Sequence, residues 1–452
     1  MALVPAESRS ALRRSLSFRD LLVYGLLFIG PLAPVGVFGV VDARTNGAVA
    51  TVYIVATIAM AFTAWSYAQM AAVVPHAGSV FAYATRGLGP TAGFLAGWLA
   101  LLDYLLIPSV AYLFSGIALH ALMPAVPAWI FTAAAFGVTT LLNFAGVRTA
   151  ARVGFAVLVV EVLVLLLFLI SAGVVVATAG PLRPWASPFL SLDTLSSSAV
   201  MGAVSIAVLS YLGFDAIAGF AEETTGSGAV VGRAIGVCLG LSGVVFVLQT
   251  MLGAWASPWL PGALVAAPER QGTAFYDMVR QLPVPGLATL IALTKAIGPA
   301  FAAMAGQAAA ARLLFGMARD GRLPSVLAGV SRDTGLPNRA LLLTAGLTLI
   351  VSITAARRAD GLAQLVALVD VGALAAFGLL HASVIGYFVV KRHPAAQWAH
   401  RVVPVVGLLV TVWVVAEASV LARSVALAWT MMGLLLARVG SARVESDVDR
   451  NR

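Results

Sequence analysis

The sequence is poor in the residues that most enzymes and metalloproteins use. It has a single cysteine, Cys238, so no disulfide can form within the chain. Its five histidines show no H-x-x-H or Cys-rich spacing, and we therefore expect no metal site. It has no nucleotide-binding motif and no paired nucleophile and base inside its apolar segments. These absences argue against an enzyme, a cofactor and ATP-driven transport by this chain alone.

Charge is also scarce. Only 10% of the residues are charged, whereas a soluble protein usually carries about 25%. Hydrophobic residues make up 61% of the chain, and long apolar runs recur along its whole length. The net charge is +9, and most of the charged residues lie between these runs. This placement favours a role in membrane topology over nucleic-acid binding. The composition predicts an all-α polytopic protein in a lipid bilayer.

Twelve segments are apolar enough, at roughly 20 residues, to cross a bilayer. They are residues 18–42, 46–73, 91–122, 127–146, 153–178, 197–221, 231–256, 286–316, 338–355, 361–390, 402–421 and 424–440. An even number of spans places both termini on one side. Lys and Arg are in excess in the loops on that side, which predicts that both termini are cytoplasmic and that the membrane is the cytoplasmic membrane.

Two of the predicted spans contain residues that interrupt a helix. The first span contains Ile29–Val37, I-G-P-L-A-P-V-G-V, in which two prolines each remove a backbone donor. The sixth span contains Ser210–Asp215, S-Y-L-G-F-D. Broken helices at membrane depth are tolerated where the freed backbone lines a cavity or is buried in protein. Breaks at corresponding positions of two halves point to a transporter's substrate site, although each break alone is also compatible with an ordinary kink.

The spacing of the breaks predicts an inverted repeat. The second break comes five spans after the first, an odd offset, so the second half enters the membrane upside down relative to the first. We expect a LeuT-like arrangement of five plus five helices, with helices 1 and 6 broken and two extra helices outside this core. The corresponding domains are an N-terminal tail (1–17), a first repeat (18–180), a second repeat (181–390), spans 11 and 12 (391–440) and a C-terminal tail (441–452).

Several motifs carry a resemblance to a known family. The segment Val74–Tyr83, V-P-H-A-G-S-V-F-A-Y, looks like a loop of the pattern P-x-A-G-[SG]-x-Y-x-Y. The segment Tyr211–Asp215, followed by Glu222-Glu223, looks like the pattern G-F-[DE]…E-E. The segment Ala311–Gly321 looks like the pattern S-R-x-x-x-x-x-x-R-D-G. In these motifs the chain resembles the amino acid–polyamine–organocation (APC) permease superfamily. The segment Gly97–Pro108, with its L-D-Y-L-L-I-P ending, is closest in pattern to the putrescine-importer branch.

The resemblance implies a secondary transporter of amino acids or polyamines, and the departures from the family pattern bear on its coupling ion. Ile29–Pro34 stands where the family usually has I-G-x-G-I-F. Glu161 stands where many members have a lysine near a sodium-like site. Span 8 lacks hydroxyl residues around Met304–Gln307, where sodium-coupled relatives of this fold place ligands. We therefore favour protons over sodium.

The chemistry of broken helices suggests how a substrate is held. Half-helix N-termini expose N–H groups and a positive dipole end, which suit a carboxylate. The expected substrate-binding residues of the first break are Gly30, Pro31, Leu32, Ala33 and Pro34. Freed carbonyls around the second break suit an ammonium group, and the expected residues there are Ser210, Tyr211 and Gly213.

An acid in the third span is a further candidate. Asp103 lies about twelve residues into the span, ~18 Å deep at ~1.5 Å per residue and near the midplane. Intramembrane acids are functional candidates by default. Asp103 could bind a substrate ammonium group or carry the coupling proton; the alternative is a structural hydrogen bond to a broken helix. Tyr104 could close over the substrate or serve core packing.

Glu161 is the main candidate for proton coupling. It lies among aliphatic residues in V-E-V, and burial disfavours the charged form of a carboxyl group. The alternative is a structural pair with Arg or Lys. Lys295, inside span 8, could snorkel or pair with such a carboxylate.

Three more acids are expected to have structural or gating roles. Asp215 follows the second break and could cap the next half-helix. Glu222 and Glu223 lie at the inner end of span 6, where they are expected to pair with arginines of the cytoplasmic loops as an inner gate or an anchor.

These observations favour a permease that imports a small amino compound with protons by alternating access. An amino acid would use the helix ends for both of its charged groups, whereas a polyamine would use acids, chiefly Asp103. An amino acid or amine exchanger is the alternative within transport, and a non-transporting membrane sensor is a weaker one. The sequence does not indicate an oligomeric state.

Overall fold

The computed structural model describes residues 14–76, 78–123, 125–145, 147–190, 196–260, 262–267, 270–271, 273–331, 335–358, 361–418 and 420–450. Of the predicted N-terminal tail, residues 1–13 lie outside these ranges.

The described chain is helical throughout, with a single isolated β-bridge between Leu16 and Thr224. The α-helices are α1 (Phe18–Ile29), α2 (Phe38–Thr45), α3 (Val49–Val73), α4 (Val80–Leu88), α5 (Pro90–Leu122), α6 (Ala128–Phe144), α7 (Val147–Ala179), α8 (Ser197–Val208), α9 (Gly228–Trp255), α10 (Ala274–Val279), α11 (Leu287–Arg319), α12 (Asn338–Ala356), α13 (Gly361–Val384), α14 (Ala399–Ala416) and α15 (Val420–Arg450). Short 3-10 helices are η2 (Ala33–Gly36), η3 (Leu209–Tyr211), η4 (Asp215–Glu223) and η6 (Ser325–Ala328), and η7 (Ile385–Val390) is a π-helix.

The prediction of a helical membrane protein is confirmed. Among the described residues, ten helical segments are long and apolar enough to cross a membrane. Two shorter apolar helices, Ala128–Phe144 and Arg423–Ala437, occupy the predicted fourth and twelfth spans. The outward faces are apolar as well: Leu141 of α6 is 71% exposed and Ile170 of α7 is 64% exposed. Such faces suit contact with lipid.

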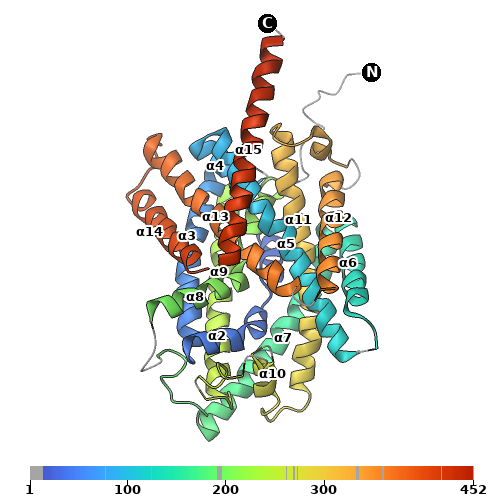
Figure 1. Ribbon diagram of the computed structural model, residues 1–452, viewed down its shortest axis with the longest axis vertical. Helices are drawn as coiled ribbons and strands as arrows, with labels where there is room; N and C mark the ends of the chain where they lie inside the picture. Colours follow the sequence, from blue (N-terminus) through green and yellow to red (C-terminus); the bar gives the residue numbers. More distant parts are fainter. Residues whose placement is uncertain are drawn as a thin grey trace.

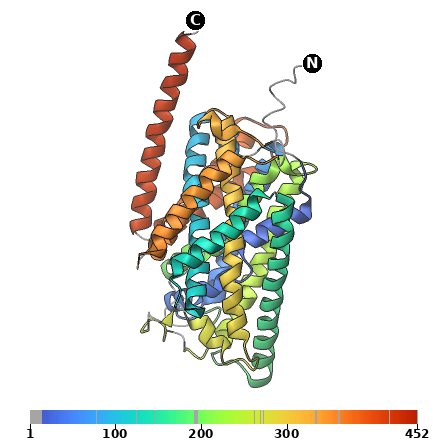
Figure 2. The same cartoon turned by 90° about the vertical axis from the view of Figure 1, so that its right-hand side faces the viewer.

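Three segments differ from the expected arrangement of spans and loops. The predicted loop at 74–90 contains α4, whose Phe81 and Tyr83 are buried while Arg86 is exposed. This amphipathic helix packs against α5 and α13. The predicted outer loop at 257–285 contains the short helix α10. Helix α15 continues to Arg450, past the expected boundary at 441, and extends beyond the other helices in Figure 2.

The long helices pack in two groups. Helix α3 lies along α9, and α1, α8 and η4 join this group. Helix α5 packs against α11 and α13, with α6 and α12 beside them. Helix α1 also contacts α7 and α11, so the first broken helix runs between the groups. Figure 1 shows α4 and the carboxyl end of α15 at one end of the molecule, and α2 and α10 at the other.

Both predicted helix breaks are present. Helix α1 ends at Ile29, Gly30 is its C-cap residue, and Pro31 and Leu32 precede η2. The chain then continues into α2. In the other break, α8 ends at Val208 and passes through η3 before η4 begins at Asp215. Because η2 and η3 contact each other, the two breaks meet inside the molecule.

Candidate functional site

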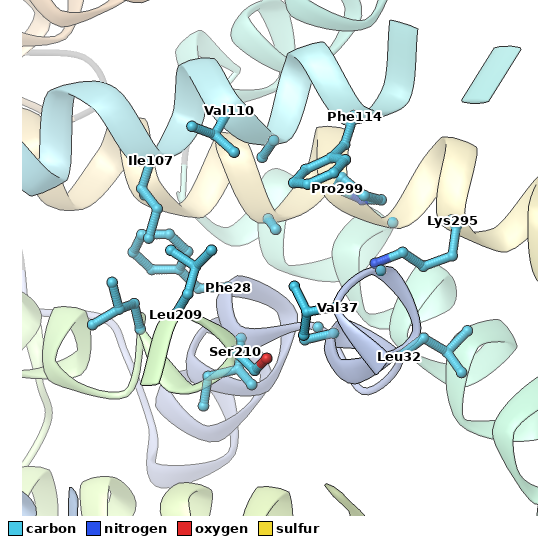
Figure 3. A pocket seen from close by; sticks show the side chains of 18 of the residues that line it. Phe28, Leu32, Val37, Ile107, Val110, Phe114, Leu209, Ser210, Lys295 and Pro299 are labelled. Carbon is cyan, nitrogen blue, oxygen red and sulfur yellow. The ribbon is translucent and has the colours of Figure 1, made fainter. Parts of the chain in front are cut away.

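A cavity of about 110 Å³ lies where the two breaks meet (Figure 3). Its walls come from both breaks and from three long helices. The lining includes Gly30, Leu32 and Ala33 of the first break, Ser210 and Leu212 of the second, Ile107, Val110 and Phe114 of α5, Glu161 of α7, and Lys295 and Gly298 of α11. Apart from its two charged side chains and Ser210, the lining is apolar, which suits a small ligand with an apolar body and a few polar groups.

The structure places some of the predicted site residues on this cavity and others away from it. Four of the substrate-binding candidates line it: Gly30, Leu32, Ala33 and Ser210. The proton-coupling candidate Glu161 lines it too. The lining does not include Pro31, Pro34, Asp103, Tyr104, Tyr211 or Gly213.

The backbone of the first break is partly satisfied within the protein. The Pro31 carbonyl accepts a hydrogen bond from Gln249 Nε2 of α9 at 3.0 Å. The Gly30 carbonyl accepts one from the Ala33 N–H at 2.9 Å. The Leu32 and Pro34 carbonyls also accept hydrogen bonds, each at 3.1 Å, from N–H groups later in the break. The bond from Gln249 holds the break against α9.

Ser210 and Tyr211 point in different directions although they are neighbours. The Ser210 hydroxyl lies 3.1 Å from Tyr53 Oη of α3 and also borders the cavity. The Tyr211 hydroxyl donates to the Tyr53 carbonyl at 3.1 Å and lies 2.7 Å from Thr57 Oγ1. Tyr211 therefore ties the second break to α3 and is directed away from the cavity.

Tyr104 and Asp215 act together at the second break. Tyr104 Oη donates to Asp215 Oδ2 at 2.6 Å, and the Gly213 N–H donates to Asp215 Oδ1 at 3.1 Å. Both side chains are 2% exposed. Asp215 thus holds the turn at Gly213 and joins it to α5, and Tyr104 is its partner.

Asp103 is buried in α5, one turn before the cavity-lining Ile107. Its side chain is 2% exposed, and its backbone packs against Gly372 of α13. A substrate in the cavity would thus contact the next turn of α5. The expected role of Asp103 in binding an ammonium group stays a prediction.

Glu161 and Lys295 bring opposite charges to the same cavity. The Glu161 side chain is 3% exposed, and its Oε2 has no hydrogen-bond partner among the described residues. Its Oε1 lies against Gly298 of α11, where a Cβ atom would overlap it. Lys295 precedes Gly298 by three residues and therefore lies on the same face of α11. In the described part of the chain the two charges form no ion pair within 4.0 Å, although both line the cavity.

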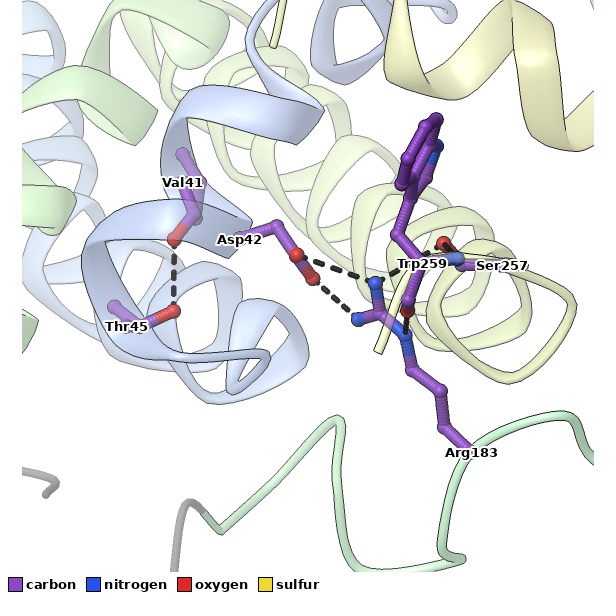
Figure 4. Close-up of polar contacts among 6 residues, drawn as sticks. All are labelled: Val41, Asp42, Thr45, Arg183, Ser257 and Trp259. Carbon is purple, nitrogen blue, oxygen red and sulfur yellow. Dashed lines mark hydrogen bonds and ion pairs between the residues drawn. The ribbon is translucent and has the colours of Figure 1, made fainter. Parts of the chain in front are cut away.

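A buried ion pair lies at the end of the molecule that carries α2 (Figure 4). Arg183, in the segment after α7, donates to both carboxylate oxygens of Asp42 in α2, with Nη2 at 3.2 Å from Oδ2. The same guanidinium donates to Ser257 Oγ at 3.0 Å and to the Trp259 carbonyl. One arginine therefore joins three segments: α2, the segment after α7 and the segment after α9.

Glu222 and Glu223 of η4 form pairs at the opposite end. Glu223 accepts from Arg312, with Nη2 at 3.0 Å from Oε2. Glu222 accepts from Arg319, with Nη1 at 2.7 Å from Oε2, and lies 3.4 Å from His76 Nδ1. Both arginines belong to α11. Arg319 lies beyond the predicted eighth span (286–316), in an expected cytoplasmic loop, whereas Arg312 lies within that span.

Sequence reasoning missed two features of this arrangement. Lys295 was only a possible partner for an acid, and its place on the cavity follows from the packing of α11 against the breaks. The pair of Asp42 and Arg183 joins residues 141 positions apart, and neither residue belongs to a recognisable motif. Within the described residues there is no group of three or more His, Cys, Asp or Glu side chains that could hold a metal ion.

Comparisons with known proteins agree with this architecture. The family model described as amino acid permease matches residues 21–434. The low-affinity putrescine importer PlaP of Escherichia coli K12 is 30% identical over 95% of this chain and 94% of its own length. The branched-chain amino acid permease BcaP of Bacillus subtilis is 26% identical over 96% of this chain and 94% of its own. The aspartate-proton symporter of Bacillus subtilis is 24% identical over 75% of this chain and 66% of its own.

Proposed function

The chain belongs to the amino acid permease family, and on that premise we propose that it imports an amino acid or a polyamine across the cytoplasmic membrane together with protons. The resemblance predicted from its motifs is confirmed, and the chain is a multi-pass membrane transporter and not an enzyme. The cargo, the coupling ion and the orientation of the termini belong to the proposal.

The observation that carries the proposal is the cavity between the two helix breaks. It lies where two short 3-10 segments replace regular helix, and the backbone of Gly30 and the hydroxyl of Ser210 border its largely apolar space. This combination suits a small compound with charged groups and a carbon skeleton. Gly30, Leu32, Ala33 and Ser210 are the predicted binding residues that border it.

The packing supports alternating access in a LeuT-like arrangement. In our proposal α1 with α2, α3, α8 with η4, and α9 form one body, and α5, α6, α11 and α12 form the other. The cavity lies between these bodies. The pair of Arg183 and Asp42 closes the outer end and the pair of Arg312 and Glu223 closes the inner end. Rocking of one body against the other opens one end at a time.

Glu161 is the group that we propose to carry the coupling proton. It borders the cavity, it is buried, and one of its oxygens has no hydrogen-bond partner among the described residues. A carboxyl group in this position can gain and lose a proton without breaking a structural hydrogen bond at that oxygen. Asp103, buried outside the cavity lining, is the second candidate.

Uptake into proteoliposomes tests the proposal. Purified protein is reconstituted, an inward proton gradient is imposed, and uptake of labelled putrescine and of a panel of labelled L-amino acids is measured with and without a protonophore. We expect saturable accumulation of at least one compound, driven by the gradient. In Glu161→Gln, exchange of labelled for unlabelled cargo should persist while accumulation is lost. The proposal would be contradicted if no compound accumulated, or if accumulation did not depend on the proton gradient. Exchange without accumulation in the unaltered protein would favour the antiporter.

A further inference from the structure

The cavity presents its ligand with one positive and one negative side chain. Glu161 and Lys295 are the titratable residues of its lining; α1, α5 and the second break contribute none. Lys295 makes no hydrogen bond or ion pair with any described residue. In Figure 3 its ammonium group points from α11 toward the first break, between Leu32 and Pro299. A charged group inside a membrane protein that lacks a close partner is available to a ligand.

The geometry of α11 keeps the two charges near each other. Gly298 has no side chain, and this allows the Glu161 carboxylate to lie against the helix one turn from Lys295. The separation of the two groups still exceeds ion-pair distance in the described structure. Among the lining residues that the structure describes, Lys295 is the one cation that an entering anion would meet.

We propose that Lys295 binds the carboxylate of the transported compound, and that this carboxylate takes over from Glu161 the role of neutralising the ammonium group. The inference rests on the proposed transport function and specifies its cargo class. The cargo is then an amino acid with an aliphatic side chain, and not a polyamine. Its side chain would lie against Ile107, Val110 and Phe114, and its ammonium group would face the carbonyls of the breaks.

The charge balance of the cavity explains why a carboxylate is favoured. Without cargo, the single positive charge of Lys295 is balanced by ionised Glu161. A polyamine would add two positive charges beside Lys295 in a space of low polarity, where like charges repel strongly. The acid that would have offset them, Asp103, does not line the cavity. A zwitterionic amino acid adds no net charge.

The same exchange links cargo to proton. When a cargo carboxylate neutralises Lys295, ionised Glu161 loses its counter-charge. Its carboxylate oxygen then binds a solvated proton (H₃O⁺) from the medium, and water is released. Loss of that proton restores the attraction between Glu161 and Lys295 and weakens the hold on the carboxylate. Proton and carboxylate therefore favour each other's binding, as linkage requires. Helices α1, α6, α9 and α11 pack on α7. Apart from Lys295, their titratable residues do not line the cavity: Arg19, Asp20 and Tyr24 of α1, Arg233 and Cys238 of α9, and Arg312 and Arg319 of α11. Helix α6 has none.

A matched pair of ligands tests this inference on the unaltered protein. L-valine and isobutylamine differ only in the carboxylate, and putrescine is the polyamine probe. We expect L-valine to bind to the detergent-solubilised protein, and isobutylamine and putrescine to bind about tenfold to hundredfold more weakly, the range that a charge-assisted hydrogen bond supplies. In weakly buffered solution with a pH indicator, binding of L-valine should remove protons from the medium.

Variants locate the effect. Lys295→Met should weaken L-valine binding by about tenfold to hundredfold. It should not weaken isobutylamine binding, because the change removes the like charge that repels the ammonium group. Lys295→Arg keeps the charge and should retain most of the affinity. Glu161→Gln should still bind L-valine but without proton uptake.

The outcomes separate this inference from the transport proposal. Gradient-driven accumulation of putrescine that survives in Lys295→Met would overturn the inference and leave the transporter proposal standing. Equal binding of L-valine and isobutylamine would also overturn it. Failure of every compound to accumulate in proteoliposomes would overturn the transport proposal, and the inference with it.

Discussion

Arg183 and Asp42 form an ion pair in which both side chains are fully buried, although 141 residues separate them in the sequence. The guanidinium makes four hydrogen bonds, because it also donates to Ser257 and to the Trp259 carbonyl. Such a pair contributes little to stability relative to apolar residues, but removing one partner leaves the other charge buried and unpaired. Its value to this protein is therefore in joining three segments at one end.

The first prediction concerns that pair. Arg183→Gln should lower the free energy of unfolding by about 3–5 kcal/mol, because the Asp42 carboxylate is left buried without a counter-charge. Thermal unfolding of the detergent-solubilised protein measures the change as a lower apparent melting temperature. Arg280→Gln is the matched control, because Arg280 forms an exposed pair with Asp277, worth about 0.2–1 kcal/mol at most. Equal shifts in the two variants would contradict the buried pair.

The second prediction concerns Tyr104. Tyr104→Phe removes the hydroxyl that donates to Asp215, and the cost should be about 1.5–3 kcal/mol if Asp215 is ionised. Tyr112→Phe is the control: its hydroxyl is equally buried but lies 2.7 Å from the neutral hydroxyl of Thr139, and its loss should cost about 0.5–1.5 kcal/mol. The melting temperatures of the two variants, each compared with that of the unaltered protein, measure these two losses of stability. A smaller loss for Tyr104→Phe than for Tyr112→Phe would show that Asp215 does not depend on this hydrogen bond.

The breaks and the apolar helices could be predicted because their causes are local in the sequence. Pro31 and Pro34 disrupt α1 wherever it packs, and a run of apolar residues has few alternatives to a membrane helix. The position of α4 was missed because its nine residues are too short to register as a span. Its helix depends on burial of one face against α5 and α13, which only the tertiary structure supplies.

The direction of individual side chains could not be predicted. Asp103 and Ile107 lie one turn apart in α5, yet only Ile107 reaches the cavity. Ser210 and Tyr211 are adjacent, yet the geometry of η3 directs one to the cavity and the other to α3. A polar residue within a membrane segment is a candidate for ligand binding. Which candidates can contact a ligand depends on where along each helix the cavity lies.

The third prediction concerns the turn of the second break. Gly213 has a φ of +123°, and a Cβ at this position would lie 2.7 Å from Phe28 Cγ. Gly213→Ala should therefore destabilise the protein by more than about 1 kcal/mol through backbone strain and the displacement of Phe28. Gly236→Ala on α9, where a Cβ meets nothing within 4 Å, should be neutral or slightly stabilising. Yield of folded protein in size-exclusion chromatography and melting temperature compare the two, and a Gly213→Ala protein as stable as Gly236→Ala would refute the strain.

The fourth prediction concerns the inner closure. Arg312 pairs with Glu223 through two nitrogens and stacks on the Phe220 ring, with its guanidinium carbon 4.1 Å from the ring centroid. Arg312→Lys keeps the positive charge but loses the two-nitrogen pairing with the carboxylate and the stacking on the ring. If the closed inner end is weakened by about 1.4 kcal/mol, the inward-open fraction rises about tenfold.

Labelling of a cysteine on the cavity measures that fraction. Cys238 is the single native cysteine, so Cys238→Ala with Ser210→Cys provides one reporter that borders the cavity. In inside-out vesicles, a membrane-impermeant maleimide should label this reporter faster when Arg312→Lys is added. Arg319→Lys is the matched control, because its pair with Glu222 is more exposed and its loss should change the rate less. Because both pairs join η4 to α11, an equal effect of the two changes would mean that the charge of the helix end, and not the buried pair, holds the inner side closed.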